Sequence, residues 1–291
     1  MQREQLSSRL GFLMLSAGCA IGVGNVWKFP WLTGQNGGGI FVLVYLCFLI
    51  LLGLPVMTME FSVGRAAQKS PVCMYQQIEP PGSKWHWHGY AALIGNVVLM
   101  MFYSVVSGWM LYYLVSSVSG TLASLDAKAV GGFFGAMLSS APTVTFYTVI
   151  TVIGAFIILS FPLRTGLETV SKWMMGLLFV LMVFLALHSL FLDGAREGLT
   201  FYLLPDFSKF TSATVVAAMN QAFFSLSIGI GSMAIFASYI NKDQSLVKES
   251  ASVIALDTVV AVLAGLIIFP ACFTYGVKPT AGPSLIFEAL P

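Results

Sequence analysis

The amino-acid sequence predicts an all-α, polytopic membrane protein that has about seven transmembrane helices. Of its 291 residues, 57% are hydrophobic and only 9% are charged. Soluble domains usually carry about 25% charged residues, so the chain is too apolar for a fold surrounded by water. A net charge of +2 without basic runs also excludes the electrostatic pattern of a nucleic-acid binder. We therefore expect a lipid bilayer, and no nucleic acid, around the protein.

The expected helices follow from the lengths of the apolar stretches. A spanning helix needs about 20 mainly apolar residues, and seven stretches meet that length. We expect them to form a single transmembrane domain over residues 1–291, with helices near residues 10–34, 39–64, 90–122, 143–161, 167–191, 212–240 and 250–276.

The distribution of basic residues predicts a cytoplasmic N-terminus. Cytoplasmic segments of membrane proteins carry an excess of Lys and Arg. With the N-terminus inside, nine basic residues face the cytoplasm: Arg3, Arg9, Arg65, Lys69, Lys84, Arg164, Lys172, Lys242 and Lys248. Five face the other side: Lys28, Lys128, Arg196, Lys209 and Lys278. We expect a multi-pass protein of the inner (plasma) membrane.

Two of the expected spans are interrupted by glycine in a similar way, at residues 17–25 (AGCAIGVGN) and 225–232 (SLSIGIGS). Glycine lowers helix propensity and lets the backbone unwind, and the freed polar groups cannot face lipid. One glycine cluster alone would favour close helix packing. Two clusters with polar flanks favour an inverted-repeat transporter whose site lies mid-membrane. We predict non-helical backbone around residues 20–24 and 227–231, facing each other.

Ionisable residues inside these spans mark functional candidates, because inserting one costs at least about 2.5 to 3.5 kcal/mol. Asp257 has no basic residue within a helical turn, so a bound cation is its natural partner. The alternative is a protonated Asp257, or one that bonds only Ser or Thr. Sodium takes oxygen ligands, and the candidates are the Ala20 carbonyl, the Asn25 amide oxygen, the Ser225 hydroxyl and carbonyl, and the Asp257 carboxylate.

Glu60 is a second ionisable residue within a span, and a scaffold role is favoured for it. Its carboxylate can accept hydrogen bonds from the amides freed in the second broken helix.

Ordered motifs throughout the chain resemble the neurotransmitter:sodium symporter family. They begin with RLGF at 9–12, GVGNVWKFP at 22–30 and NGGGIF at 36–41. They continue with GLPVMTMEFSVGR at 53–65, LPDF at 204–207, QAFFSLSIGIG at 221–231 and ASYINKDQ at 237–244. The resemblance implies a broken-helix fold of twelve helices, of which this chain holds the first seven.

The resemblance also implies two sodium sites and a substrate site. It places the first sodium at Ala20, Asn25, Ser225 and Asp257, and the second at the carbonyls of Gly18 and Ile21. In the family the second site is completed by the eighth helix. The substrate site would comprise Ala20, Val23, Gly24, Leu99, Tyr103, Val106, Phe224, Ser225, Ser227 and Ile230. Ser227 would line the side-chain pocket, although a serine on a broken helix more often bonds backbone.

The same resemblance implies a set of gate residues and a class of substrate. The gate residues would be Arg3, Lys28, Phe224 and Tyr239, with Lys28 in place of an extracellular arginine. Monoamine carriers of the family have an aspartate where this chain has Gly22, so its absence favours an amino acid. Ala261 offers no hydroxyl for chloride, and Asp257 already supplies negative charge, so chloride dependence is not expected.

We expect sodium-coupled symport of a hydrophobic amino acid by alternating access, without covalent chemistry or an organic cofactor. The protein is not expected to be an enzyme, because the sequence lacks a nucleophile, base and metal set. The competing interpretation is a truncated, transport-incompetent product, or one piece of a split transporter. The expected partners are an amino acid, sodium ions and the bilayer, with missing C-terminal helices or a second copy left open.

Overall fold

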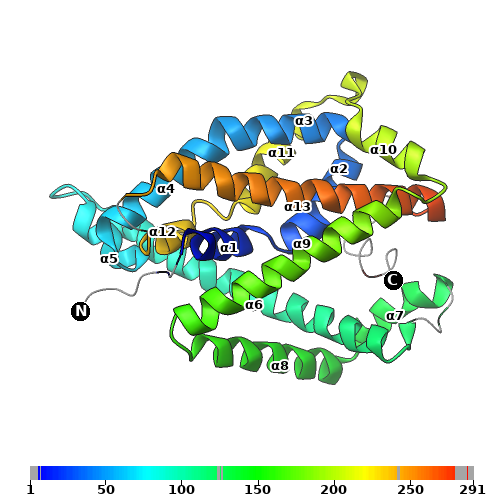
Figure 1. Cartoon of the computed structure of the whole chain (residues 1–291), viewed down its shortest axis with the longest axis horizontal. Coiled ribbons are helices and arrows are strands. Elements are labelled where there is room, and N and C mark those ends of the chain that lie inside the picture. Colours follow the sequence, from blue (N-terminus) through cyan, green and yellow to red (C-terminus); the bar gives the residue numbers. More distant parts are fainter. Residues whose placement is uncertain are drawn as a thin grey trace.

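The computed structural model describes residues 6, 8–122, 125, 127–240, 243–278 and 287, and its architecture is helical (Figure 1). The elements are α1 (Arg9–Ala20), η1 (Gly24–Lys28), α2 (Phe29–Gln35), α3 (Gly39–Phe48), η2 (Leu49–Gly53), α4 (Leu54–Ala67), α5 (Pro71–Ile78), α6 (His86–Val118), α7 (Ala127–Ser139), α8 (Ala141–Leu159), η4 (Arg164–Glu168), α9 (Thr169–Ser189), α10 (Ala195–Leu203), η5 (Phe207–Lys209), α11 (Ser212–Ser225), α12 (Ser232–Ala237) and α13 (Leu246–Tyr275).

Among the described residues, five continuous helical stretches are long and apolar enough to cross a membrane: 39–67, 86–118, 141–159, 164–189 and 246–275. Residues 9–20 and 24–35 pass the same test together as one span bent by 54°. The expected span at 212–240 is divided between α11 and α12, which hold 14 and 6 residues. A helix rises 1.5 Å per residue, so neither piece crosses the bilayer alone.

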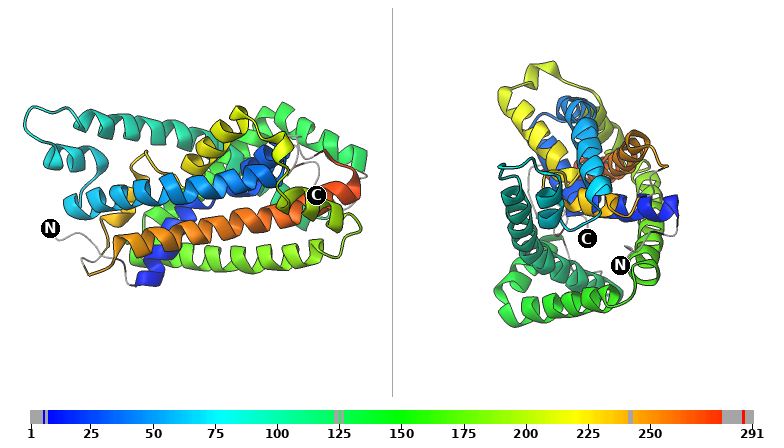
Figure 2. Two further views of the ribbon diagram at one scale, coloured as in Figure 1. Left: turned by 90° about the horizontal axis from the view of Figure 1, so that it is seen from above. Right: turned by 90° about the vertical axis from the view of Figure 1, so that its left-hand side faces the viewer.

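The helices run largely side by side, and α13 lies at the centre (Figures 1 and 2). It packs against α1, α4, α9 and α10, and 44% of its most apolar stretch is buried inside the protein. The corresponding share for α8, which packs along α6, is 0%. This contrast places the core around α13 and puts α8 at the periphery.

Capping residues set several helix ends. The Ser8 hydroxyl accepts a hydrogen bond from Gly11 N–H and starts α1, and the Thr211 hydroxyl does the same for α11 through Thr214 N–H. At the other end of the bundle, α13 stops at Gly276, whose φ of 67° is a left-handed cap that glycine adopts without strain.

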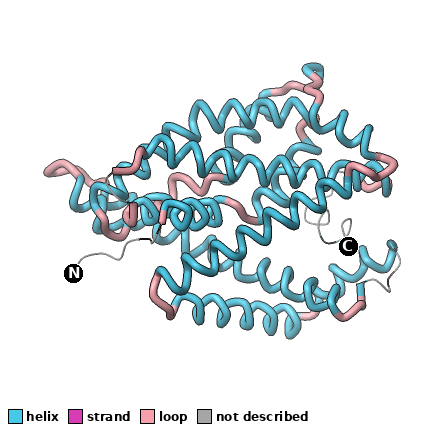
Figure 3. Tube along the Cα trace, in the orientation of Figure 1, coloured by secondary structure: helices cyan, strands magenta, loops and turns pink. Residues whose placement is uncertain are grey.

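Helical structure is interrupted inside the bundle as well as at its ends (Figure 3). Between α1 and η1 only Ile21 and Gly22 form the break, with an isolated helical residue, Val23, before the π-helix. The predicted break at residues 20–24 is therefore too long, because Ala20 still belongs to α1 and Gly24 already begins η1. Between α11 and α12 the break extends over residues 226–231, and it includes the whole predicted segment.

Candidate functional site: two broken helices around a buried carboxylate

Asp257 on α13 is the centre of a polar cluster that joins the two broken helices. Its carboxylate is 0% exposed and accepts hydrogen bonds from the Ser225 hydroxyl at 2.6 Å and from Asn25 Nδ2 at 2.7 Å. The Tyr45 hydroxyl reaches the same carboxylate at 3.5 Å and Ser225 Oγ at 3.3 Å. These partners come from η1, α11 and α3. All of them are neutral, so the carboxylate has no basic partner in this cluster.

Asn25 connects this cluster to the break in the first helix. Its amide nitrogen donates to Asp257, while its Oδ1 accepts from Gly22 N–H at 3.2 Å. The amide oxygen predicted as a sodium ligand is thus already bonded to a backbone amide freed by the break. Gln221, one helical turn before Ser225 on α11, donates to the Gly24 carbonyl at 3.1 Å.

The break also frees backbone carbonyls at the end of α1. Among the described residues, no backbone amide donates to the carbonyls of Gly18, Ala20 or Ile21. The Cys19 carbonyl between them accepts from the Ser227 hydroxyl at 3.2 Å. Gly18, Ala20 and Ile21 are the three carbonyls that the resemblance assigns to sodium. Unbonded carbonyl oxygens are the ligand type that a hard cation takes.

The second broken helix is held by a carboxylate from α4. Glu60 Oε2 accepts from Gly229 N–H at 3.1 Å, and the amides of Gly231 and Ala234 also face this carboxylate. The expected contact between Glu60 and amides freed by the second break is therefore present. Ser227 bonds the backbone of α1, which was the alternative to a role in the side-chain pocket.

A cavity of about 260 Å³ lies beside the broken helices. It is lined by Val23, Gly24, Trp27, Lys28, Trp31, Phe102, Tyr103 and Phe224. Four of the expected substrate residues, Val23, Gly24, Tyr103 and Phe224, meet on its wall. The other six do not line it: Ala20, Leu99, Val106, Ser225, Ser227 and Ile230.

Lys28 and Phe224 connect the two broken helices at this cavity. Lys28 Nζ lies 3.5 Å from the centre of the Phe224 ring, a cation–π distance. The ring also lies against Gly24, where an added Cβ would come within 2.8 Å of it. Tyr239, a further expected gate residue, packs partly buried against the main core. Arg3 lies outside the described residues.

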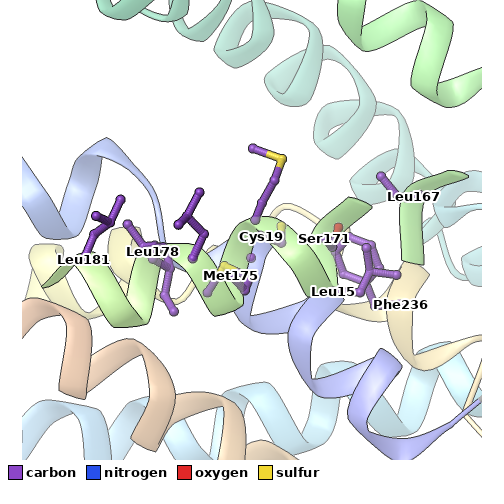
Figure 4. Close-up of a pocket in the computed structure, with 12 residues that line it drawn as sticks. Leu15, Cys19, Leu167, Ser171, Met175, Leu178, Leu181 and Phe236 are labelled. Atoms are coloured by element: carbon purple, nitrogen blue, oxygen red, sulfur yellow. The ribbon is translucent and has the colours of Figure 1, made fainter. Parts of the chain in front are cut away.

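A larger apolar groove, of about 520 Å³, runs along α1 and α9 (Figure 4). Leu15, Cys19, Met175 and Leu178 line it together with Gly18 and Ile21. The two residues expected at the second sodium site therefore lie on this groove, whose lining does not include Asp257. Their carbonyls receive no backbone hydrogen bond from the described residues, so these oxygens remain available to a ligand.

Sequence reasoning missed Tyr45, Gln221 and Asn96. Gln221 was detectable, because it stands four residues before Ser225 and shares its helix face. Asn96 donates to the Ile230 carbonyl at 2.8 Å and lies on the face of α6 that carries Leu99 and Tyr103. Tyr45 gave no comparable signal, since a tyrosine in an apolar span is common near membrane interfaces.

Comparisons with known proteins agree with this architecture. A model of the sodium:neurotransmitter symporter family matches residues 3–129 and 135–278. YhdH of Bacillus subtilis, described as an uncharacterized sodium-dependent transporter, is 38% identical over 287 residues, which are 99% of this chain and 63% of the relative. A similarly described Haemophilus influenzae transporter is 38% identical over 299 residues, covering 100% of this chain and 65% of its own length.

More distant and structural relatives extend the match. The sodium-dependent serotonin transporter of Drosophila melanogaster is 27% identical, covering 99% of this chain and 53% of its own length. The crystal structure of MhsT in complex with L-phenylalanine superimposes with a TM-score of 0.92 at 40% identity, covering 100% of this chain and 66% of MhsT. The chain thus spans less than two thirds of the length of each of these relatives. It is a multi-pass membrane protein and belongs to the sodium:neurotransmitter symporter family.

Proposed function

We propose that this protein mediates sodium-coupled symport of a hydrophobic amino acid by alternating access. The observation that carries the proposal is the Asp257 carboxylate, which is fully buried and bonded only to neutral groups. Removing an ionised carboxylate from water without a counter-charge costs several kcal/mol. A sodium ion beside Asp257, Ser225 and the free Ala20 carbonyl would supply that charge.

The cavity supports an amino acid with an apolar side chain as substrate. Its wall is mainly aromatic, and Val23 and Gly24 come from the broken first helix. A basic side chain buried there would lie beside Lys28 without a counter-charge, which would be costly, whereas each buried methylene contributes about 0.8 kcal/mol. MhsT, the structural relative, was crystallised with L-phenylalanine.

Sodium and substrate would be coupled through shared ligands. The resemblance assigns Ala20 and Ser225 to both sites, so occupation of one site would orient ligands of the other. By linkage, each ligand raises the affinity of the other by the same factor. A second sodium would bind the carbonyls of Gly18 and Ile21, with further ligands outside the described residues. The N-terminus would lie in the cytoplasm, and the protein in the plasma (inner) membrane.

The experiment that tests this function is uptake into proteoliposomes by the product of the complete reading frame. Leucine or phenylalanine uptake should require an inward sodium gradient and persist when gluconate replaces chloride. Uptake that proceeds equally with choline in place of sodium would refute the coupling. Glycine or a monoamine competing better than leucine would refute the substrate class.

The sodium site is tested by Asp257→Asn, which keeps the shape of the side chain and removes its charge. We expect the sodium concentration for half-maximal substrate binding to rise by about tenfold or more, which corresponds to the loss of a charge-assisted contact of about 1.4 kcal/mol or more. The other expected result is that substrate binding comes to require chloride. Tyr45→Phe, which removes a neutral hydroxyl with long contacts to the carboxylate and to Ser225 and leaves the charge in place, is the matched control. Unchanged sodium affinity in Asp257→Asn would refute the assignment.

A further inference from the structure

A side chain of α6 anchors the unwound segment at residues 226–231. Asn96 Nδ2 donates to the Ile230 carbonyl at 2.8 Å and to the Ala92 carbonyl of its own helix, also at 2.8 Å. Because α6 is continuous through this region, its backbone does not need the contact with Ile230. The bond therefore serves the broken helix, which it ties to a long, regular one.

The anchor lies on the helix face that reaches the cavity. Asn96, Leu99, Tyr103 and Val106 are spaced by three and four residues, so they share one face of α6. Tyr103 lines the cavity, and Val106 is buried. Asn96 thus stands two turns from Tyr103 on the same face. It contacts the backbone of Ile230, whose side chain the family resemblance places at the substrate.

The unwound segment depends on such external support. Ser227, Gly229 and Gly231 all have positive φ values, of 51°, 88° and 76°, so the segment cannot form consecutive helical hydrogen bonds. Glu60 from α4 accepts from the Gly229 amide at 3.1 Å. Asn96 from α6 donates to the carbonyl of the next residue. An acceptor and a donor on two different helices therefore hold the backbone of two adjacent residues, Gly229 and Ile230.

We infer that Asn96 is a positioning residue that limits the size of the accepted side chain, by fixing the Ile230 carbonyl and with it the Ile230 side chain. The inference rests on the proposed function, because it concerns the selectivity of that substrate site. Without the anchor, Ile230 gains freedom to move away from the pocket. Larger side chains such as tryptophan then gain affinity relative to leucine.

The test compares Asn96→Ser with Ser104→Ala in sodium-dependent binding of leucine and tryptophan to the full-length protein. A serine hydroxyl reaches the carbonyl four residues earlier, as Ser104 does to Met100 on the same helix at 2.7 Å, but it is too short for Ile230. Asn96→Ser should shift the affinity ratio toward tryptophan by about fivefold, the effect of one lost hydrogen bond. Ser104→Ala should leave the ratio unchanged.

Hydrogen exchange at residues 229–231 separates a specific role from a structural one and does not depend on binding. Exchange in Asn96→Ser should speed up by about fivefold or more as the segment loses its anchor. Faster exchange with an unchanged affinity ratio would reduce Asn96 to a structural support and overturn the inference, as would no change in either measurement. A wild-type protein that binds neither amino acid would instead overturn the proposed function, and the selectivity inference with it.

A second variant, Asn96→Gln, tests the inference if the Asn96→Ser protein does not fold. Asn96→Gln keeps the amide donor and lengthens the link by one methylene. It should displace Ile230 and shift the same affinity ratio in the same direction, by less than Asn96→Ser. A wild-type ratio in a folded Asn96→Gln protein would overturn the inference.

Discussion

The backbone groups freed at the two helix breaks are hydrogen-bonded in different ways. The first break contains only Ile21 and Gly22, and the next polar side chain in the sequence, Asn25, accepts from the freed Gly22 amide. The second break extends over residues 226–231, and the groups that hold it, Glu60 and Asn96, come from α4 and α6. The first is supported largely from within its own helix, and the second from its neighbours.

The two breaks also differ in their backbone conformation. Positive φ values occur at three positions in the second break and at none of residues 20–25. In the first break Ile21 is extended, with φ of −75° and ψ of 111°, a conformation that any residue adopts without strain, and helical structure resumes at Val23. In the second break Ser227 is a non-glycine residue in the left-handed region, which costs about 1 to 2 kcal/mol, whereas Gly229 and Gly231 adopt it without strain. Changes in α4 and α6 should thus act mainly on the second break, because the first is held instead by Gln221 and by the Asp257 cluster.

The largest expected effect is loss of the Glu60 carboxylate. Glu60→Met removes the acceptor for Gly229 N–H while keeping a long side chain, and a hydrogen bond to a charged group is worth about 1.5 to 3 kcal/mol. We expect a thermal unfolding midpoint several degrees lower, measured in detergent, since about 1 kcal/mol corresponds to about 2 to 4 °C for a chain of this size class. Glu60→Gln, which retains one acceptor oxygen, should lose less. An unchanged midpoint in Glu60→Met would show that the second break supports itself.

A pair of glycine substitutions compares the two breaks directly. Gly229 has φ of +88°, and nothing lies within 4 Å of the position that an added Cβ would take, so Gly229→Ala adds backbone strain without a clash. That strain costs about 1 to 2 kcal/mol. Gly22 lacks a positive φ, and an added Cβ would lie 3.8 Å from the Tyr103 ring, an ordinary contact. Gly22→Ala should therefore change the free energy of unfolding by less than about 0.5 kcal/mol.

The thermal unfolding midpoint in detergent, measured for both glycine variants, tests this comparison. Equal losses of stability in Gly22→Ala and Gly229→Ala would contradict the conformational difference between the breaks. A loss confined to Gly22→Ala would reverse it.

Much of this fold could be predicted from the sequence, because lipid imposes a strong constraint. Apolar stretches of about 20 residues must be helices, and the two glycine clusters with polar neighbours indicated where helices break. Asp257 stood out because a lone carboxylate within a span is costly. The contact of Glu60 with the second break followed from the same argument, since freed amides need an acceptor.

The lengths of the breaks and their partners could not be predicted in the same way. Gly24 remains helical because it begins η1, a π-helical turn. No local residue pattern predicts such a turn. Tyr45 joins the Asp257 cluster only because α3 packs beside α11, a tertiary contact that the pattern within α3 does not show. Asn96 could have been predicted as a site residue, because it shares a helix face with Tyr103. Its partner could not, because that partner is a backbone carbonyl, which no residue type identifies.

The smallest expected effect tests the link between the two breaks. Lys28 follows the first break and Phe224 precedes the second, and their cation–π contact at 3.5 Å is one of the links between the two regions. Lys28→Met keeps the length of the side chain and removes its charge. A cation–π contact that is not fully desolvated is worth about 0.5 to 1 kcal/mol, so bound amino acid should dissociate about two- to fivefold faster.

A double-mutant cycle isolates this contact from the other effects of each substitution. Phe224→Leu removes the ring, so Lys28→Met should have little further effect in that background. Lys28→Arg keeps a cation over the ring and should preserve slow dissociation. If Lys28→Met speeds dissociation equally with and without the Phe224 ring, the two breaks are not coupled through this pair. In that case the direct contacts left between them among the described residues would be hydrogen bonds: those of the Asn25, Ser225 and Asp257 cluster, that of Gln221 to the Gly24 carbonyl and that of Ser227 to the Cys19 carbonyl.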